Sequence, residues 1–278
     1  EELFGVEGQG NFADPATGKP TGLNILRLAG TDTAAGREVV QEERLLRLRE
    51  EARLRLLAAR AERVRPLRDE KILADWNGLT IAALARSAFV LAEPRYLEAA
   101  RAAAGFVRSR MLTPEGRLFH RWCRDEAAVA GYLDDYAFLI WGLIELYEAG
   151  FETRDLQMAA ALQGIVADRF RDPAGGFFFT PDDGERLPAR LKESHDGAIP
   201  SGNAVMLMNL IRLSRMTGNH RLEEEAAALI RAFAGSIRQQ PSAHEQWMIG
   251  LGMWAAPSCE GVIAGRAGAA DTRALIDA

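Results

Sequence analysis

Cysteine is scarce in this chain: Cys123 and Cys259 are the only two among 278 residues, and they form no CxxC pair. Zinc and redox motifs that are built on paired cysteines are therefore not expected. The two thiols are typical of a reduced cytosolic protein, and a disulfide between them remains the alternative.

An excess of positive charge is also missing. Lys and Arg number 34 against 39 Asp and Glu, so the net charge is −5 at pH 7. This balance offers no broad positive field to phosphate backbones or anionic lipids, and nucleic acid is not an expected partner. No apolar run approaches the roughly 20 residues of a membrane helix, and no signal peptide opens the chain. The sequence predicts a soluble, cytoplasmic protein without a membrane partner.

Several familiar motifs are absent as well. The sequence contains no GxGxxG, GxxxxGK[ST] or GxSxG, so nucleotide binding and a serine-hydrolase mechanism have no support. The chain has four histidines, and no two of them have the spacing of metal ligands on a helix. We therefore expect no metal and no other cofactor.

Helical periodicity is the strongest positive signal. Segments that are apolar nearly all round begin near residues 76, 133, 203 and 244 and predict buried helices. Half-polar segments near 38, 95, 154 and 220 predict helices that cover a surface. This alternation predicts an all-α fold, an (α/α) toroid of helical hairpins whose buried helices lie parallel around a cavity. An irregular helical bundle is the alternative.

Composition divides the chain into three parts. Residues 1–37 are rich in Gly, Asn and Pro and read as a loop-rich lead-in. Residues 38–257 form the predicted toroid domain of about eight helices. Residues 258–278 read as a tail with a short strand at 260–265 and a helix starting at 271. Two long connections, within 112–131 and 172–200, carry aromatic residues, which predicts a β-hairpin or an ordered flap in each.

Polar segments precede three of the buried helices: ADWNG at 74–78, YLDDY at 132–136 and DGAIPSGN at 196–203. Parallel helices would bring these starts to one end of the toroid, where free N–H groups carry partial positive charge. Carboxylates and amides bind hydroxyl groups, aromatic faces pack on sugar rings, and paired carboxylates can act as acid and base. The pattern predicts a carbohydrate cavity. The alternative for each Asp or Ser is a plain helix N-cap.

The residues expected at this cavity fall into two groups. Candidate acids and bases are Asp75, Asp135, Asp196, His195 and His244. Candidate substrate-binding residues are Trp76, Asn77, Tyr136, Arg190, Lys192, Ser201 and Asn203.

The tandem acids Asp134 and Asp135 point about 100° apart on a helix, so at most one faces the cavity directly, and Asp135 is favoured. Histidine is the side chain most often used as a general acid or base near neutral pH, which makes His195 a candidate for that role. The charged run at 190–197 is equally typical of a solvated loop. His120 is a further candidate.

Four segments, in this order, resemble one protein family: DEKILADWNGLTIAALARSA (69–88), GYLDDYAFLIWGLIELYEA (131–149), GGFFFT (175–180) and RLKESHDGAIPSGNAVMLMNL (190–210). That family, of the spermatogenesis-associated protein type, joins an N-terminal thioredoxin-like domain to a C-terminal region similar to six-hairpin glycosidases and N-acylglucosamine 2-epimerases. The resemblance implies that this chain is the later, toroid part. It also implies that a thioredoxin-like domain lies upstream, and that the inner helix near residue 76 exposes an apolar flank.

The resemblance supplies no reaction. Related epimerases use two histidines, for which His195 and His244 are available, and related hydrolases use paired carboxylates, for which Asp75, Asp135 and Asp196 are available. We therefore expect a carbohydrate-binding or carbohydrate-processing toroid, epimerase-like or glycosidase-like. The alternative is a non-catalytic scaffold that serves the thioredoxin-like domain.

Overall fold

The computed structural model describes residues 4–27, 39–257, 261, 263–266 and 269–276. Contacts within the chain define two units, residues 1–69 and residues 70–278. This boundary falls after residue 69, whereas the sequence starts the toroid domain at residue 38. The three predicted domain limits stay a prediction.

The first unit contains a small hairpin and one long helix. Strands β1 (Phe12–Ala13) and β2 (Pro20–Leu23) pair antiparallel, and helix α1 spans Val39–Ala61. The Asp14 carboxylate accepts the N–H groups of Ala16 and Thr17, both at 2.9 Å, and so fixes the turn between the strands.

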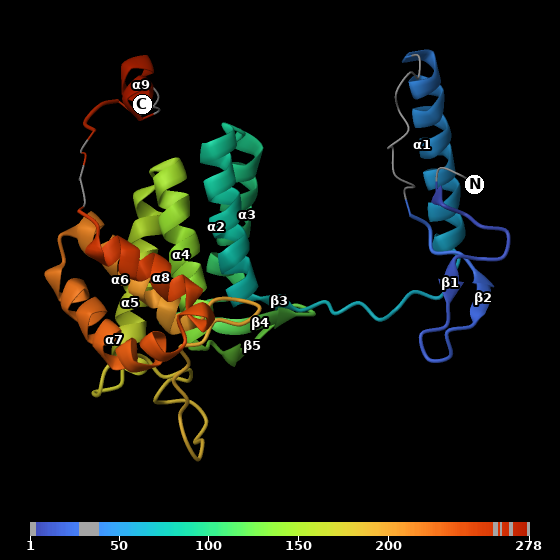
Figure 1. Cartoon of the computed structure of the whole chain (residues 1–278). Helices are drawn as coiled ribbons and strands as arrows, with labels where there is room; N and C mark the ends of the chain where they lie inside the picture. Colours follow the sequence, from blue (N-terminus) through green and yellow to red (C-terminus); the bar gives the residue numbers. More distant parts are fainter. Residues whose placement is uncertain (1–3, 28–38, 258–260, 262, 267–268, 277–278) are drawn as a thin grey trace. The chain divides into compact units, whose positions relative to one another are not determined.

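The second unit is built from helical hairpins (Figure 1). The paired helices are α2 (Ala74–Leu91) with α3 (Pro94–Arg110), α4 (Leu133–Gly150) with α5 (Thr153–Arg169), and α6 (Gly202–Thr217) with α7 (His220–Gln239). Helix α8 (Glu245–Ala255) follows a 3₁₀ turn, η2 (Pro241–Ala243), and packs on α6. The predicted alternation of apolar and half-polar helices is confirmed.

Each hairpin turns through a residue in the left-handed region. Ala92, Phe151 and Gly218 end α2, α4 and α6 with φ of 52°, 54° and 66°. A left-handed residue stops the helix and reverses the chain within a short link. Each second helix therefore returns antiparallel to the first.

The inner layer runs α2, α4, α6, α8, with each helix packed against the next. Helices α4 and α6 are buried along most of their length, as predicted. Helix α2 is different, because it buries only one face and leaves Phe89, Val90 and Leu91 exposed. The prediction that this whole segment is buried is wrong, whereas the exposed flank that the resemblance implied is present.

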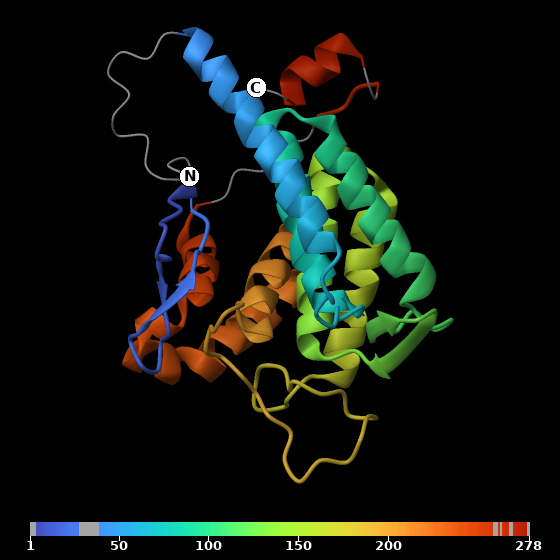
Figure 2. The ribbon, with the colours of Figure 1, turned by 90° about the vertical axis from the view of Figure 1, so that its right-hand side faces the viewer.

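A three-stranded antiparallel sheet, in the order β3-β4-β5, precedes and follows the first helical hairpin. Its strands are β3 (Ile72–Leu73), β4 (Phe119–Cys123) and β5 (Glu126–Ala130). The β-hairpin predicted within 112–131 is confirmed. The connection at 172–200 is an ordered flap, whose first turn is closed by a bridge between Arg171 and Phe177. Both lie at the same end of the helices (Figures 1 and 2).

The tail contains helix α9 (Ala270–Ile276), close to the predicted start at residue 271. The strand predicted at 260–265 is not found at residues 261 and 263–265, and residues 260 and 262 lie outside the described part. Cys259 lies outside it too. None of the helices in the described ranges is both long and apolar enough to traverse a bilayer.

Candidate functional site

The inner helices all begin at one end of the second unit. The N–H of Asp75, in the first turn of α2, donates to Oδ1 of Asp135 in α4 at 3.0 Å. The carboxylate of Asp196 accepts the N–H of Ser201 before α6 and that of Gln246 in α8, both at 2.8 Å. These bonds connect neighbouring helix starts, which is the arrangement that a toroid of parallel inner helices requires.

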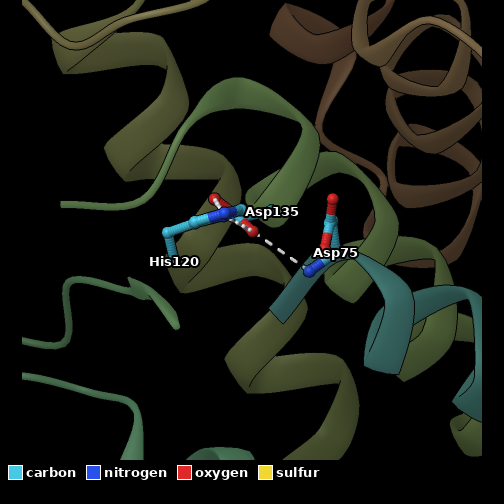
Figure 3. A group of neighbouring side chains, drawn as sticks. All are labelled: Asp75, His120 and Asp135. Atoms are coloured by element: carbon cyan, nitrogen blue, oxygen red, sulfur yellow. Dashed lines mark hydrogen bonds and ion pairs between the residues drawn. The ribbon is translucent and has the colours of Figure 1, made fainter. Parts of the chain in front are cut away.

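A histidine and an aspartate form the centre of this end (Figure 3). Strand β4 carries His120, whose Nδ1 lies 3.0 Å from both carboxylate oxygens of Asp135. Asp135 is fully buried, and its two oxygens also accept the N–H groups of Asp75 and Tyr132. Asp135 is thus held by main-chain donors from two segments, and it fixes the orientation of the His120 ring.

The contact between His120 and Asp135 affects the protonation state of the His120 imidazole. The hydrogen bond and charge of Asp135 raise the pKa of His120, against the opposing effect of burial. Burial raises the pKa of Asp135, while the bond to His120 acts against it. With the Nδ1 proton donated to Asp135, the second ring nitrogen of His120, Nε2, is left to exchange a proton or bind a ligand.

Asp134, the residue before Asp135, has a strongly perturbed carboxyl group. Burial, followed by the charges of Asp135, Glu193 and Asp75, raises the pKa of Asp134 to about 7. The N–H of Gly202, at the start of α6, donates to its carboxylate and acts in the opposite direction. Asp134 therefore keeps a proton up to neutral pH.

Asp75 completes the group, which we call the aspartate cluster: Asp75, Asp134, Asp135 and His120. The Asp75 side chain is 9% exposed, and its Oδ1 accepts the N–H of Trp76 at 2.7 Å. Burial is the main cause that raises the pKa of Asp75. The indole of Trp76 is 60% exposed, so an aromatic face lies open beside the cluster in sequence.

Three members of the cluster could hold a metal ion. Ligand atoms of Asp75, His120 and Asp135 all lie within 4.8 Å of one another. No metal is expected from the sequence. A cation bound through Nδ1 would have to displace the proton that joins His120 to Asp135.

Aromatic rings line the site on the flap side. Tyr132 stacks on Phe179 of the flap, with ring centroids 4.9 Å apart and an interplanar angle of 10°. The His120 ring meets Tyr132 with centroids 5.1 Å apart. These contacts fasten the flap to the start of α4.

Several predicted substrate-binding residues hold the chain together instead. Ser201 caps α6 by accepting the N–H of Ala204, and the Asn203 amide bonds to both main-chain groups of Phe177 and to the carbonyl of Glu193. Together with the bonds from Asp196 to two helix starts, these bonds support the alternative prediction that the polar residues before the inner helices act as helix caps.

Asn77 and Tyr136 are engaged with main-chain groups in the same way. Asn77 donates to the carbonyl of Leu73 at 2.8 Å. The Tyr136 hydroxyl accepts the N–H of Leu118 at 3.0 Å within the core. Tyr136 thus anchors the β-hairpin to α4.

The two candidate histidines of the flap side contact each other. Ring centroids of His195 and His244 lie 4.6 Å apart. His244 is fully buried, with Nδ1 2.7 Å from the carbonyl of Gln240 and Nε2 3.2 Å from the hydroxyls of Ser194 and Ser236. Rings in contact leave no room for a sugar between them, so they do not form opposed proton donors.

The basic residues of the flap are also bound within it. Lys192 pairs with Asp172 at 2.6 Å and donates to the carbonyl of Gly175. Arg190 donates to the carbonyl of Thr180 and lies 4.2 Å above the ring of Phe178. Both side chains stabilise the flap.

A separate hollow of about 590 Å³ lies further along the inner helices. It is lined largely by apolar side chains of α2, α4, α6 and α8. Its charges neutralise one another, since Arg212 bonds to Glu145 and to Glu148, each at 2.7 Å. The aspartate cluster is therefore the stronger candidate for chemistry.

The sequence does not predict the roles of three solvent-accessible residues of the site. It favours Asp135 over Asp134, it places Glu193 in a charged loop, and it gives His120 as a candidate without a partner. A histidine in the β-hairpin that directly precedes a helix start with tandem acids is the sequence signal for the His120–Asp135 pair.

The fold is that of an (α/α) toroid, as comparison with solved structures shows. A sugar epimerase from a ruminal bacterium matches with a TM-score of 0.51 and 14% identity, over 59% of this chain and 44% of that one. A GH76 α-mannanase of Bacteroides thetaiotaomicron matches with a TM-score of 0.50 and 17% identity, over 63% of this chain and 46% of that one. At such identities the likeness concerns the fold alone.

In sequence, the chain is 33% identical over 289 residues to spermatogenesis-associated protein 20 of Homo sapiens. The match covers 98% of this chain and 36% of the human protein, so the chain spans about a third of that relative's length. The resemblance to the spermatogenesis-associated protein family is thereby confirmed. No protein-family model matches the chain.

Proposed function

We propose that the chain hydrolyses a glycosidic bond at the aspartate cluster, with Asp134 as the general acid. One observation supports this above the others: burial and neighbouring carboxyl groups raise the pKa of Asp134 to about 7. A glycosidase needs one carboxyl group that is protonated near neutral pH beside another that is ionised.

The neighbouring residues have matching roles. Asp134 gives its proton to the glycosidic oxygen as the bond to the anomeric carbon breaks. A water molecule then adds to the anomeric carbon and gives a proton back to the Asp134 carboxylate. Asp75 is the second carboxylate, which stabilises the positive charge that develops on the sugar ring. His120, oriented by Asp135, presents Nε2 to a sugar hydroxyl, and Trp76 offers a face for the ring.

The similar solved structures agree with a carbohydrate substrate, because one is described as a mannanase and another as a sugar epimerase. Epimerisation by paired histidines has less support, since His195 and His244 contact each other. A thioredoxin-like domain upstream remains a prediction from the family resemblance.

The test compares leaving groups. Wild-type protein and the Asp134→Asn variant are assayed at pH 6 on panels of α- and β-glycosides with alkyl or dinitrophenyl leaving groups. Loss of the acid should lower kcat/KM by about 10²- to 10⁴-fold on alkyl glycosides. Dinitrophenolate leaves without protonation, so activity on those substrates should fall far less.

The matched control is Glu148→Gln, which removes one charge at the opposite end of α4. The Glu148→Gln variant should hydrolyse alkyl and dinitrophenyl glycosides with the kcat/KM of the wild type, both with and without EDTA. Equal losses on both leaving groups for Asp134→Asn would refute the acid role. A wild-type chain that neither binds nor cleaves any sugar would favour the scaffold alternative.

A further inference from the structure

We infer that the aspartate cluster selects its carbohydrate by charge, accepting neutral and positively charged sugars and excluding uronates and sugar phosphates, with Glu193 as a specificity-determining residue. This inference rests on the proposed carbohydrate site and names its substrate class.

Negative charge at the site is in excess. Asp75, Asp135 and Glu193 all act on Asp134 through their charges. Asp75 is 9% exposed, and its carboxylate accepts main-chain N–H bonds and is acted on by the charge of His120. A buried carboxylate that is held by main-chain groups favours a ligand that brings hydroxyl donors or positive charge over one that adds negative charge.

Several cationic side chains near the cluster are bound to groups of the chain itself. His120 is bonded to Asp135, and Lys71 acts on the site as a positive charge that lowers the pKa of His120. Arg117 forms a two-pronged pair with Asp183, and the basic residues Arg190 and Lys192 are bound within the flap. Arg117 and Arg190 are therefore not free to grip a ligand carboxylate or phosphate in the usual forked manner.

Helix N-termini could bind an anion, but these are already occupied. The N–H groups of Asp75 and Gly202 donate to Asp135 and Asp134. At the next two helix starts, Ser201 and Gln246 donate to Asp196. The chain's own carboxylates thus use the donors that would otherwise attract an acidic sugar.

Glu193 is the most accessible carboxyl group of this set. Its side chain is exposed, while its carbonyl is held by the Asn203 amide at 2.9 Å, which fixes its position on the flap. Its charge reaches Asp134. An approaching anion therefore meets the negative charge of Glu193.

The test is calorimetric binding to three sugars that share one ring: glucose, glucosamine and glucuronate, repeated in the galacto and manno series. At pH 6 and low salt, the glucuronate-type sugar should bind about tenfold more weakly than the neutral sugar. The amino sugar should bind at least as tightly as the neutral one. Glu193→Gln should reduce the ratio of the Kd for the acidic sugar to the Kd for the neutral sugar by about threefold or more. Glu148→Gln should leave this ratio unchanged.

The outcomes separate the inference from the proposed function. A uronate that binds as tightly as the neutral sugar would overturn charge selection while leaving the carbohydrate site in place. If Glu193→Gln leaves the ratio of the two dissociation constants unchanged, Glu193 does not determine the specificity of the site. The expected binding order without any glycoside cleavage would support the inference and refute hydrolysis, and an absence of binding to every sugar would refute both.

Discussion

At the scale of single residues, Asp134 links the site to the stability of the fold. Its pKa lies near 7 in the folded chain against an ordinary value of 3.8. Between these two values the folded state holds a proton that the unfolded state has lost. The free energy of unfolding contributed by this group is therefore full below about pH 4 and falls as the pH rises towards 7.

Asp134→Asn should abolish this pH dependence, because the amide cannot ionise and can still accept the Gly202 N–H. At pH 8 we expect the variant to be more stable than the wild type by about 2 to 4 kcal/mol, and at pH 4 nearly equal to it. Urea unfolding at a series of pH values measures the difference. Asp125→Asn, in the exposed turn between β4 and β5, is the charge-matched control and should show no such divergence. A difference that is the same at pH 4 and pH 8 would contradict the raised pKa.

Residue types at helix starts could be predicted from sequence, but their roles could not. An Asp before or within a first turn serves as a cap or as a site residue by the same chemistry. Asp196 joins two helix starts, whereas Asp75 accepts the N–H of Trp76 in its own helix and belongs to the cluster around His120. Only the path of β4, which carries His120 to Asp135, distinguishes these cases.

At the scale of elements, α2 and α4 pack closely through two glycines. A Cβ at Gly78 would lie 2.4 Å from the main-chain carbon of Phe138, and one at Gly142 would lie 2.7 Å from the carbonyl oxygen of Gly78. Main-chain atoms cannot yield as a flexible side chain does. This close approach also sets the distance at which the N–H of Asp75 reaches Asp135.

Gly78→Ala should therefore destabilise the chain by about 3 kcal/mol or more, despite the better helix propensity of alanine. Gly164→Ala in α5 is the matched control, because a Cβ there meets nothing within 4 Å. It should be neutral or stabilise by about 0.5 to 1 kcal/mol. The denaturation midpoints of the two variants measure this difference in stability. If Gly78→Ala is as stable as Gly164→Ala, the close contact between α2 and α4 is refuted.

The helices themselves were readable from periodicity, since apolar and half-polar segments alternate at the positions where α2 to α8 lie. The burial of each inner helix was not, because it depends on neighbours on both sides. Helices α4 and α6 have an inner neighbour on each side and are buried, whereas α2, at the end of the described inner layer, exposes Phe89 to Leu91. The flap was recognised as ordered, although its fastening by Asn203 and Lys192 needed the fold.

At the scale of the whole molecule, the second unit holds every part of the candidate site. Asp75, His120, Asp134, Asp135 and Glu193 all belong to residues 70–278. So do the inner helices α2, α4, α6 and α8 and the strand that delivers His120. The contacts that build the site are therefore internal to one unit.

A fragment of residues 70–278 should fold cooperatively and keep the order of sugar binding expected for the whole chain, because its core and its aspartate cluster are complete. Its thermal transition should lie within about 3 °C of the corresponding transition in the 278-residue chain, as measured by calorimetry. A fragment of residues 94–278 is the control: it lacks β3 and α2, loses the surface that covers α4, and should not show a cooperative transition. If residues 70–278 unfold without a transition while the whole chain melts cooperatively, the stability of the toroid depends on residues 1–69, and the site is not self-contained.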